Sequence, residues 1–464
     1  MDILNDKNKE IENIDNDHIK VILSLKDSKA NNLMSSSKNI HATKKEKVNL
    51  LRDAHKANIS NIKDILHKSE YQHIIYKSSI SSGGFILQGN QTVINKFLEE
   101  IKGNIKTVIK DYKIKRFEPI ITKDIKKTTN KIQSLTINDS TNWGTTRIGC
   151  PSVWANQYLG DNMLIATADT GVDPNHPQLK DNYSGIWINT TTSVAYPTAY
   201  DIVSHGTHVT GIACGKNILG KTIGVAPNAK WMCMKVLDDT GSGNFSWFID
   251  ACDVILDVNY KGEIPDAINC SFGASYPYTT HWTSYDSTDT DFINRITRLN
   301  SLGIFVSFAV GNENETQSMG YPGSIPVAYA VGATDITDII APFSSRGTSP
   351  FYVNTTVPDI KPDIVCPGVS ILSSVTSAYV PYKYSDGTSE TIYTDSQGGK
   401  YVIWDGTSMA TPHLTGSVVI LKQVLEKQLG KNMNTQAAID LILKVINDIS
   451  DVTDLGTTGK DYTY

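Results

Sequence analysis

Three side chains that could serve as nucleophile, base and orienting carboxylate lie in separate motifs of this 464-residue sequence. Asp169 ends the apolar run MLIATA (163–168), which places a carboxylate at the carboxyl end of an expected buried strand. His205 begins an expected helix in SHGTHVTGIACG, and Ser408 opens another in DGTSMATPH. A histidine oriented by a carboxylate can take the proton of a serine hydroxyl, and a helix N-terminus favours the negative charge that develops. The three motifs therefore predict nucleophilic catalysis.

A fourth polar residue, Asn312, follows the expected strand GIFVSFAV (303–310). Its side-chain amide could donate to an oxyanion beside the backbone N–H of Ser408. The strings ADTGVDPNHPQL, SHGTHVTG, AVGNEN and DGTSMATPH occur in the order Asp, His, Asn, Ser. With these motifs, residues 141–464 resemble the subtilisin family, the subtilases. The resemblance implies a serine endopeptidase that forms an acyl-enzyme, requires no cofactor and acts as a monomer on polypeptides.

The same resemblance implies a substrate cleft. An edge strand would pair with the substrate backbone, which gives broad specificity because it reads main chain. With no charged residue along its walls, the primary pocket is expected to prefer an apolar or aromatic side chain before the scissile bond. Phe272 stands where the family more usually has Leu, which leaves the neighbouring apolar subsite open. The predicted substrate-binding residues are Gly241, Ser242, Gly243, Ser271, Phe272, Gly273, Ala309, Gly311 and Gly320.

Two alternative functions would use parts of the same sequence. Asp169-Thr-Gly and Asp239-Thr-Gly resemble the paired loops of an aspartic protease, but they are too close in sequence for two β-lobes. A catalytically silent binding protein on the same scaffold would be expected to lack an aligned triad. His208 lies three positions beyond His205 in the same expected helix, and we assign it to packing.

Apolar strands alternate with amphipathic helices from residue 141 onward, which favours an α/β fold with three layers and a mainly parallel sheet covered on both faces. Residues 18–117 read strand, helix, strand, strand, helix, strand, the order of a small α+β ferredoxin-like module, with 105–117 as its last strand. Residues 1–17 form a polar tail. Residues 118–140 are predicted to be an exposed linker with a processing site.

Charge is divided unevenly within the formal net charge of −5: residues 1–135 carry +9 and the remainder −14. Opposite charges favour docking of the two parts. The subtilase resemblance implies that residues 18–117 are an inhibitory prodomain that assists folding and makes the chain a self-processing zymogen. Lysines are interleaved with acidic residues rather than clustered, so no nucleic-acid partner is predicted.

Six cysteines show no metal-binding spacing and are expected to be mostly free and buried. Neither a secretory signal nor an apolar run long enough for a membrane is recognisable, which suggests a cytoplasmic chain, whereas the resemblance suggests secretion; the compartment stays open. The family commonly binds calcium, but Ile218 stands where a ligating Asn is expected, so a structural calcium ion stays unassigned. The final GTTGKDYTY stops where similar proteins continue, which suggests a truncated end.

Overall fold

The computed structural model describes most of the chain from His18 onward, and the account below is confined to those residues. They are 18–26, 42–120, 133–134, 143–192, 196–218, 221–257, 259–274, 290–313, 319–325, 327–349, 360–384, 389–430, 439–442, 444, 451–454 and 460–463.

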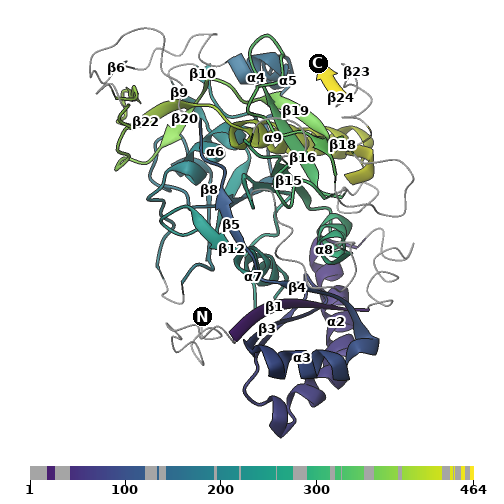
Figure 1. Ribbon diagram of the computed structural model, residues 1–464. Coiled ribbons are helices and arrows are strands. Elements are labelled where there is room, and N and C mark those ends of the chain that lie inside the picture. Colours follow the sequence, from purple (N-terminus) through teal and green to yellow (C-terminus); the bar gives the residue numbers. More distant parts are fainter. Residues whose placement is uncertain are drawn as a thin grey trace.

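The amino-terminal module has the expected ferredoxin-like topology (Figure 1). Its antiparallel sheet has the order β2-β3-β1-β4, and Thr43 and Glu46 form a capping box that starts the first helix. The elements are β1 His18–Leu25, α2 Lys44–Leu66, η2 Ser69–Tyr71, β2 Ile75–Ser79, β3 Gly84–Asn90, α3 Gln91–Glu100, η3 Lys102–Asn104 and β4 Ile105–Lys110.

A seven-stranded sheet forms the centre of the larger part, and every neighbouring pair of its strands is parallel. Its order is β19-β16-β15-β13-β7-β11-β8, with β7 in the middle region. The α/β prediction is therefore confirmed. The strands are β7 Leu164–Asp169, β8 Tyr183–Asn189, β11 Lys230–Lys235, β13 Ala267–Cys270, β15 Phe305–Ala309, β16 Tyr329–Thr334 and β19 Ile364–Pro367.

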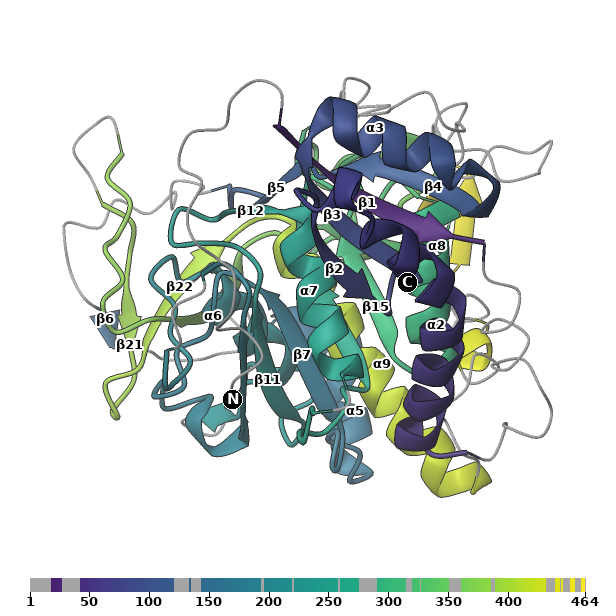
Figure 2. The same cartoon turned by 90° about the horizontal axis from the view of Figure 1, so that it is seen from below.

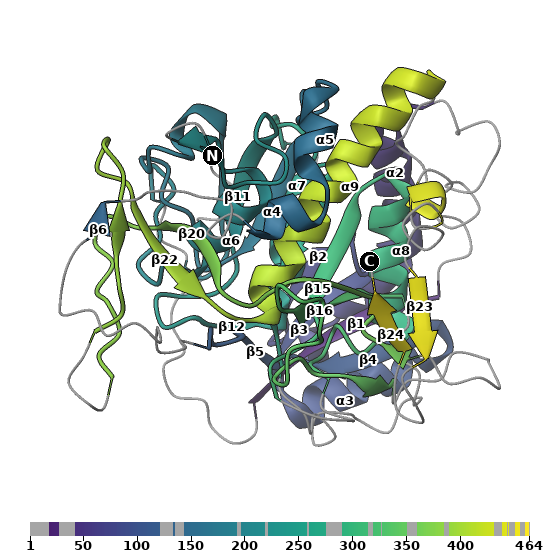
Figure 3. The same ribbon diagram turned by 90° about the horizontal axis from the view of Figure 1, so that it is seen from above.

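Helices cover both faces of this sheet, which makes three layers. Alternate residues of β7 face opposite sides: Leu164, Ala166 and Ala168 join the core under α7 (Phe245–Leu256) and α8 (Thr290–Ser301), whereas Ile165 joins the core under α6 (His205–Cys214) and α9 (Thr407–Leu429). Figure 3 shows α9 on the face away from the amino-terminal module. Val48 and Leu51 of α2 belong to the core on the α7 side, so the module packs there (Figure 2).

The expectation of one strand over 105–117 is wrong. The chain turns at Asp111 and Tyr112, and the next strand, β5 (Lys113–Arg116), leaves the module to lie between β12 (Ser242–Asn244) and β14 (Phe272–Gly273). Asp111 accepts hydrogen bonds from the backbone N–H and the hydroxyl of Ser246 at the start of α7. Tyr112 stacks on Phe245 with ring centroids 4.6 Å apart. These contacts hold the turn against the larger part of the chain.

Smaller elements complete the described chain. Part of the predicted linker is structured, because β6 pairs with β21 and Ile120 bridges Asp405. All six cysteines are free and buried, as expected of most of them. No helix in the described ranges is both long and apolar enough to cross a membrane. The remaining bounds are β6 Gln133–Ser134, α4 Trp143–Arg147, α5 Cys150–Ala155, η4 Lys180–Asn182, β9 Asn217–Ile218, β10 Lys221–Thr222, β17 Gly347–Thr348, β18 Ile360–Lys361, β20 Ile371–Val375, β21 Tyr393–Thr394, β22 Lys400–Trp404, β23 Asp451–Asp454 and β24 Lys460–Thr463.

Candidate active site

The predicted carboxylate and base are hydrogen-bonded to each other. His205 Nδ1 lies 2.8 Å from Asp169 Oδ1, and both side chains are completely buried. Asp169 ends β7, and His205 is the first residue of α6, so the sheet edge and the helix N-terminus set their positions. The backbone N–H of Thr170 also donates to Asp169 Oδ1, at 2.7 Å. This arrangement fixes the ring so that His205 Nε2 is left for other chemistry.

Ser408 is the second residue of α9 and is buried. Its hydroxyl donates to the carbonyl oxygen of Ser271 at 3.2 Å and to that of Phe117 at 3.5 Å. His205 Nε2 has no hydrogen-bond partner among the described residues. Catalytic hydrogen bonds between serine and histidine are often long outside a reacting complex, and the unpaired Nε2 is the atom a base requires.

Asn312 is oriented by the residue that precedes Ser408. Its Oδ1 accepts hydrogen bonds from the backbone N–H and the hydroxyl of Thr407, at 2.9 and 2.8 Å. Its Nδ2 can only donate, and it points to the carbonyl oxygen of Glu118 at 3.1 Å. The amide donor therefore contacts the main chain one carbonyl beyond the Phe117 carbonyl that the Ser408 hydroxyl faces.

The segment over Ser408 directly follows β5, which is bound between two predicted walls of the cleft. Ser242 and Gly243 pair antiparallel with Lys115 and Ile114, and the N–H of Arg116 donates to Gly241 at 2.9 Å. On the other wall, Phe272 and Gly273 of β14 pair antiparallel with Arg116 and Lys115. The chain's own residues thus add a strand between two edges.

The Phe117 side chain occupies the predicted primary pocket. Its ring is 2% exposed, and a Cβ placed on Gly273 or Gly320 would lie 2.6 or 2.5 Å from its Cζ. Glycine at these two positions is therefore required by the ring. Ala309, which ends β15, and Gly311 are buried at the edge of the sheet from which Asn312 extends.

Ile114, three residues before Phe117, fills a second apolar site. It is 1% exposed and belongs to a core cluster that includes Leu237, Phe245 and Phe272. The Phe272 ring packs edge-to-face on Phe248, 5.5 Å between centroids. Phe272, where the family more usually has Leu, and Ile114 are thus buried in the same core cluster.

The comparisons with known proteins agree with this geometry. The model of the Subtilase family matches residues 160–458. The chain belongs to the subtilase family. It is 31% identical to bacillopeptidase F of Bacillus subtilis, over 69% of this chain and 21% of that protein. It is 32% identical to subtilisin E of the same species, over 60% of each, and 30% identical to an intracellular serine protease of Paenibacillus polymyxa, over 61% of this chain and 72% of that protein.

This subtilase offers no support for the aspartic-protease alternative. Asp169 is bonded to His205, whereas the Asp239 side chain is 45% exposed and its carboxylate lies 2.8 Å from the ammonium of Lys235. A shared proton needs two adjacent carboxyls, each free of such partners. His208 is buried, stacks on Trp404 with centroids 4.4 Å apart, and faces the Val402 carbonyl oxygen. Burial lowers the pKa of His208 to about 3, so it is a neutral packing residue.

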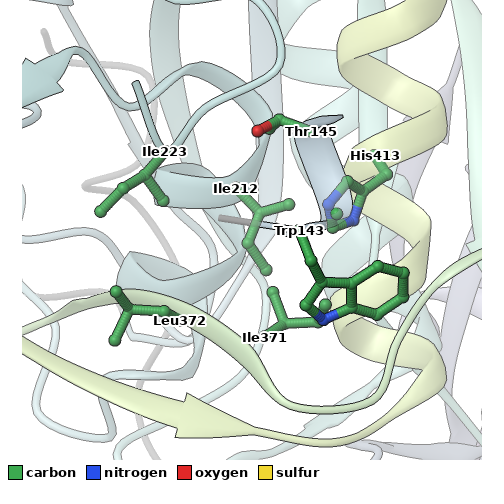
Figure 4. Close-up of a pocket in the computed structure, with 8 residues that line it drawn as sticks. Trp143, Thr145, Ile212, Ile223, Ile371, Leu372 and His413 are labelled. Atoms are coloured by element: carbon green, nitrogen blue, oxygen red, sulfur yellow. The ribbon is translucent and has the colours of Figure 1, made fainter. Parts of the chain in front are cut away.

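A separate small pocket lies between α4, α6, β20 and α9 of the subtilase (Figure 4). Most of its lining side chains are apolar and Thr145 supplies the one side-chain oxygen, so they do not offer the set of oxygen ligands that a hard cation prefers. In the described part of the chain no group of three or more His, Cys, Asp and Glu side chains could hold a metal. The calcium expectation concerns Ile218, the last residue of β9, and the structure does not describe the side chain of this residue. The pocket residues are Trp143, Gly144, Thr145, Ile212, Ile223, Ile371, Leu372 and His413.

Sequence reasoning missed two participants in the subtilase site. The backbone N–H and the hydroxyl of Thr407 both donate to Asn312 and orient it. The position of Thr407 directly before Ser408 is the sequence feature that could have indicated this role. Phe117 fills the pocket, and the signal for it was an aromatic residue at the end of the module followed by Glu118 and Pro119. The catalytic and substrate-binding roles of the residues named above stay predictions.

Proposed function

We propose that this chain is a serine endopeptidase that hydrolyses peptide bonds through an acyl-enzyme. The observation that carries the proposal is the carbonyl oxygen of Phe117 lying 3.5 Å from Ser408 Oγ, in a site where Asp169 orients His205. The chain spans only 21% of bacillopeptidase F and 60% of subtilisin E, so the activity of the whole protein is a proposal and is tested below.

The proposed reaction uses side chains and backbone of the chain itself. His205 Nε2 takes the proton of the Ser408 hydroxyl as the oxygen attacks the peptide carbonyl carbon. Asn312 Nδ2 and backbone N–H groups stabilise the oxyanion. His205 then gives the proton to the leaving amine, and the C–N bond breaks. Water, deprotonated by His205, releases the acyl group and restores Ser408.

We further propose that the first substrate is the chain's own Phe117–Glu118 bond. Phe117 fills the apolar pocket, which also supports a preference for apolar or aromatic residues before the scissile bond. Asn312 contacts the carbonyl of Glu118 rather than that of Phe117, so a shift of one carbonyl must precede attack. The next bond, Glu118–Pro119, is a tertiary amide whose nitrogen carries no hydrogen, and we assign cleavage to the bond before it.

The amino-terminal module then acts as an intramolecular inhibitor. Several polar contacts support this: Lys77 pairs with Asp250 at 2.7 Å, Ser81 N–H donates to Asp253 at 2.7 Å, and Lys44 pairs with Asp266 at 2.5 Å. Strand β5 blocks the cleft until it leaves. The uneven charge of the two parts is thus expressed in specific pairs of module and catalytic residues.

The test is expression of the wild type, Ser408→Ala and the matched control Ser417→Ala. Ser417 lies on the same helix, and its hydroxyl bonds to the His413 carbonyl. We expect intact mass to show residues 118–464 for wild type and Ser417→Ala, and the uncut chain for Ser408→Ala. Peptides with Phe before the bond should be cut faster than peptides with Lys.

If all three proteins stay uncut and none hydrolyses a peptide, the endopeptidase proposal is wrong and a silent binding protein is favoured. A new terminus at Pro119 or later would contradict the assignment of the bond but not the activity.

A further inference from the structure

A completely buried lysine lies beside the candidate triad and has no part in the proposed reaction. Lys235 is the last residue of β11 and pairs in register with Asp169 of the parallel strand β7. Its ammonium donates to the Thr170 carbonyl, pairs with Asp239 at 2.8 Å, and lies 5.0 Å from the centre of the Tyr200 ring. A buried ammonium is costly, so these contacts need an explanation.

Thr170, the residue that Lys235 holds, contacts both halves of the Asp–His pair. Its N–H donates to Asp169 Oδ1 at 2.7 Å, the same oxygen that faces His205 Nδ1. Its hydroxyl accepts the N–H of Gly206, directly after His205, at 3.0 Å. The backbone on either side of Thr170 therefore determines where the carboxylate and the imidazole lie.

The same threonine hydroxyl donates to Asp201, a buried carboxylate at the N-terminus of α6. Asp201 Oδ1 accepts from Thr170 at 3.0 Å and from the Ser204 N–H at 2.9 Å, and Oδ2 accepts from the N–H and hydroxyl of Thr207. Burial raises the pKa of Asp201, and the charge of Asp169 adds to this, while the Thr207 hydrogen bonds and Lys235 oppose it. The charge of Lys235 thus acts on Asp201, and its strand register places it beside Asp169.

We propose that Lys235 is a positioning residue for the Asp169–His205 pair: its ammonium fixes the Thr170 peptide and balances the buried charges of Asp169 and Asp201. The proposal rests on the endopeptidase activity proposed above. Asp239 is the weaker partner, because its half-exposed carboxylate is solvated and can leave the pair at small cost.

The test replaces Lys235 by Met, which keeps the length and removes the charge. Lys361 is a matched control, because it is equally buried, donates to the Ala328 carbonyl at 2.7 Å and pairs with Asp363 at 2.8 Å, beside β16 at the far side of the sheet. In Lys235→Met we expect kcat to fall about 10- to 100-fold with KM changed less than about twofold, as for misplaced catalytic groups. Lys361→Met should lose thermal stability without this loss of kcat.

The pH profile gives a readout that a structural role would not move. Removing a positive charge near the Asp169–His205 pair favours the imidazolium, so the acid limb of kcat/KM should move to higher pH in Lys235→Met and stay in place in Lys361→Met. In the described part of the chain, the titratable or charged groups that face this centre are Asp169, Asp201, Asp238, Asp239, His205, His208, Cys233 and Tyr200.

Chemical rescue completes the test. Lys235→Ala should regain activity severalfold with ethylammonium or propylammonium, and none with tetramethylammonium, which cannot donate hydrogen bonds. If Lys235→Met does not fold, Lys235→Gln and Lys235→Arg are compared, and only the Arg variant should keep the parent's acid limb. If the wild type is active and Lys235→Met has the same kcat and pH profile, this inference is wrong but the proposed function stands. If the wild type itself is inactive, the proposed function is wrong.

Discussion

Two buried charge clusters lie at opposite edges of the seven-stranded sheet and differ in how completely their atoms are paired. At the carboxyl edge, His205 Nε2 and Asp169 Oδ2 have no hydrogen-bond partner among the described residues. At the amino edge, Asp266 precedes β13; its Oδ1 accepts from Lys44 and Lys422, each at 2.5 Å, and its Oδ2 accepts the Leu164 N–H. One cluster keeps reactive atoms unpaired, and the other satisfies its carboxylate.

The difference separates a chemical role from a structural one. Buried polar atoms without partners cost free energy, and at the carboxyl edge they include the imidazole nitrogen that the proposed reaction uses. The amino-edge cluster joins three elements: α2 of the module through Lys44, α9 through Lys422, and the start of β13 through Asp266. Burial lowers the pKa of Lys44 to about 8, although the Asp266 charge opposes this. We therefore expect substitutions at the two edges to have opposite signatures.

The largest effect is expected for Asp169→Asn at the carboxyl edge. An amide in place of the carboxylate allows the wrong imidazole tautomer, and kcat should fall about 10⁴-fold, as is typical of such triads. The free energy of unfolding should change little, because the side-chain shape is kept. The rate of self-cleavage, followed by intact mass, and hydrolysis of a Phe-containing peptide measure the loss.

Asp239→Asn is the matched control, because Asp239 begins a second Asp-Thr-Gly tripeptide elsewhere in the chain. Its side chain is 45% exposed, so activity should stay near that of the wild type. Equal losses in the two variants would remove the distinction between them.

At the amino edge, Asp266→Ala should instead reduce stability. It leaves the ammonium groups of Lys44 and Lys422 buried without their carboxylate, and breaking a buried ion pair from one side costs about 3–5 kcal/mol. Denaturant unfolding in a Ser408→Ala background, where self-cleavage is prevented, measures this free energy. Lys44→Met keeps the Asp266–Lys422 pair and should lose less. A stable Asp266→Ala protein with reduced kcat would reverse the comparison.

The stability contributed by Asp266 should also depend on pH. Burial acts to raise its pKa, but the charges of Lys422 and Lys44 outweigh burial and hold the pKa at about 2, against an ordinary 3.8. A depressed carboxyl pKa stabilises the folded state above pH 3.8, and this contribution, roughly 2 kcal/mol, is lost as pH falls from 3.8 to 2. Between pH 3.8 and 2, the free energy of unfolding of Asp266→Ala should therefore change less with pH than that of the Ser408→Ala parent.

The sequence allowed the carboxyl edge to be predicted better than the amino edge. Each candidate catalytic residue lies at the end of a buried strand or at the start of a helix: Asp169, His205, Asn312 and Ser408. The hydrophobic period and the local motifs predict such positions without knowledge of contacts between distant parts of the chain. Lys44 and Asp266 are 222 positions apart, and nothing local indicates that they meet. The turn at Asp111 was missed for the same reason.

The smallest effect is expected at the exposed pair Lys77–Asp250, which joins β2 of the module to α7 at 2.7 Å. The Lys77 side chain is 47% exposed, so water and salt screen the attraction, and such pairs contribute about 0.2–1 kcal/mol. Lys77→Ala, in the Ser408→Ala background, should lower the free energy of unfolding by no more than this, and the difference should vanish at high salt. A loss of stability as large as that of Asp266→Ala, and unaffected by salt, would contradict this prediction. It would show that the exposure of an ion pair does not determine how much that pair stabilises the docked module.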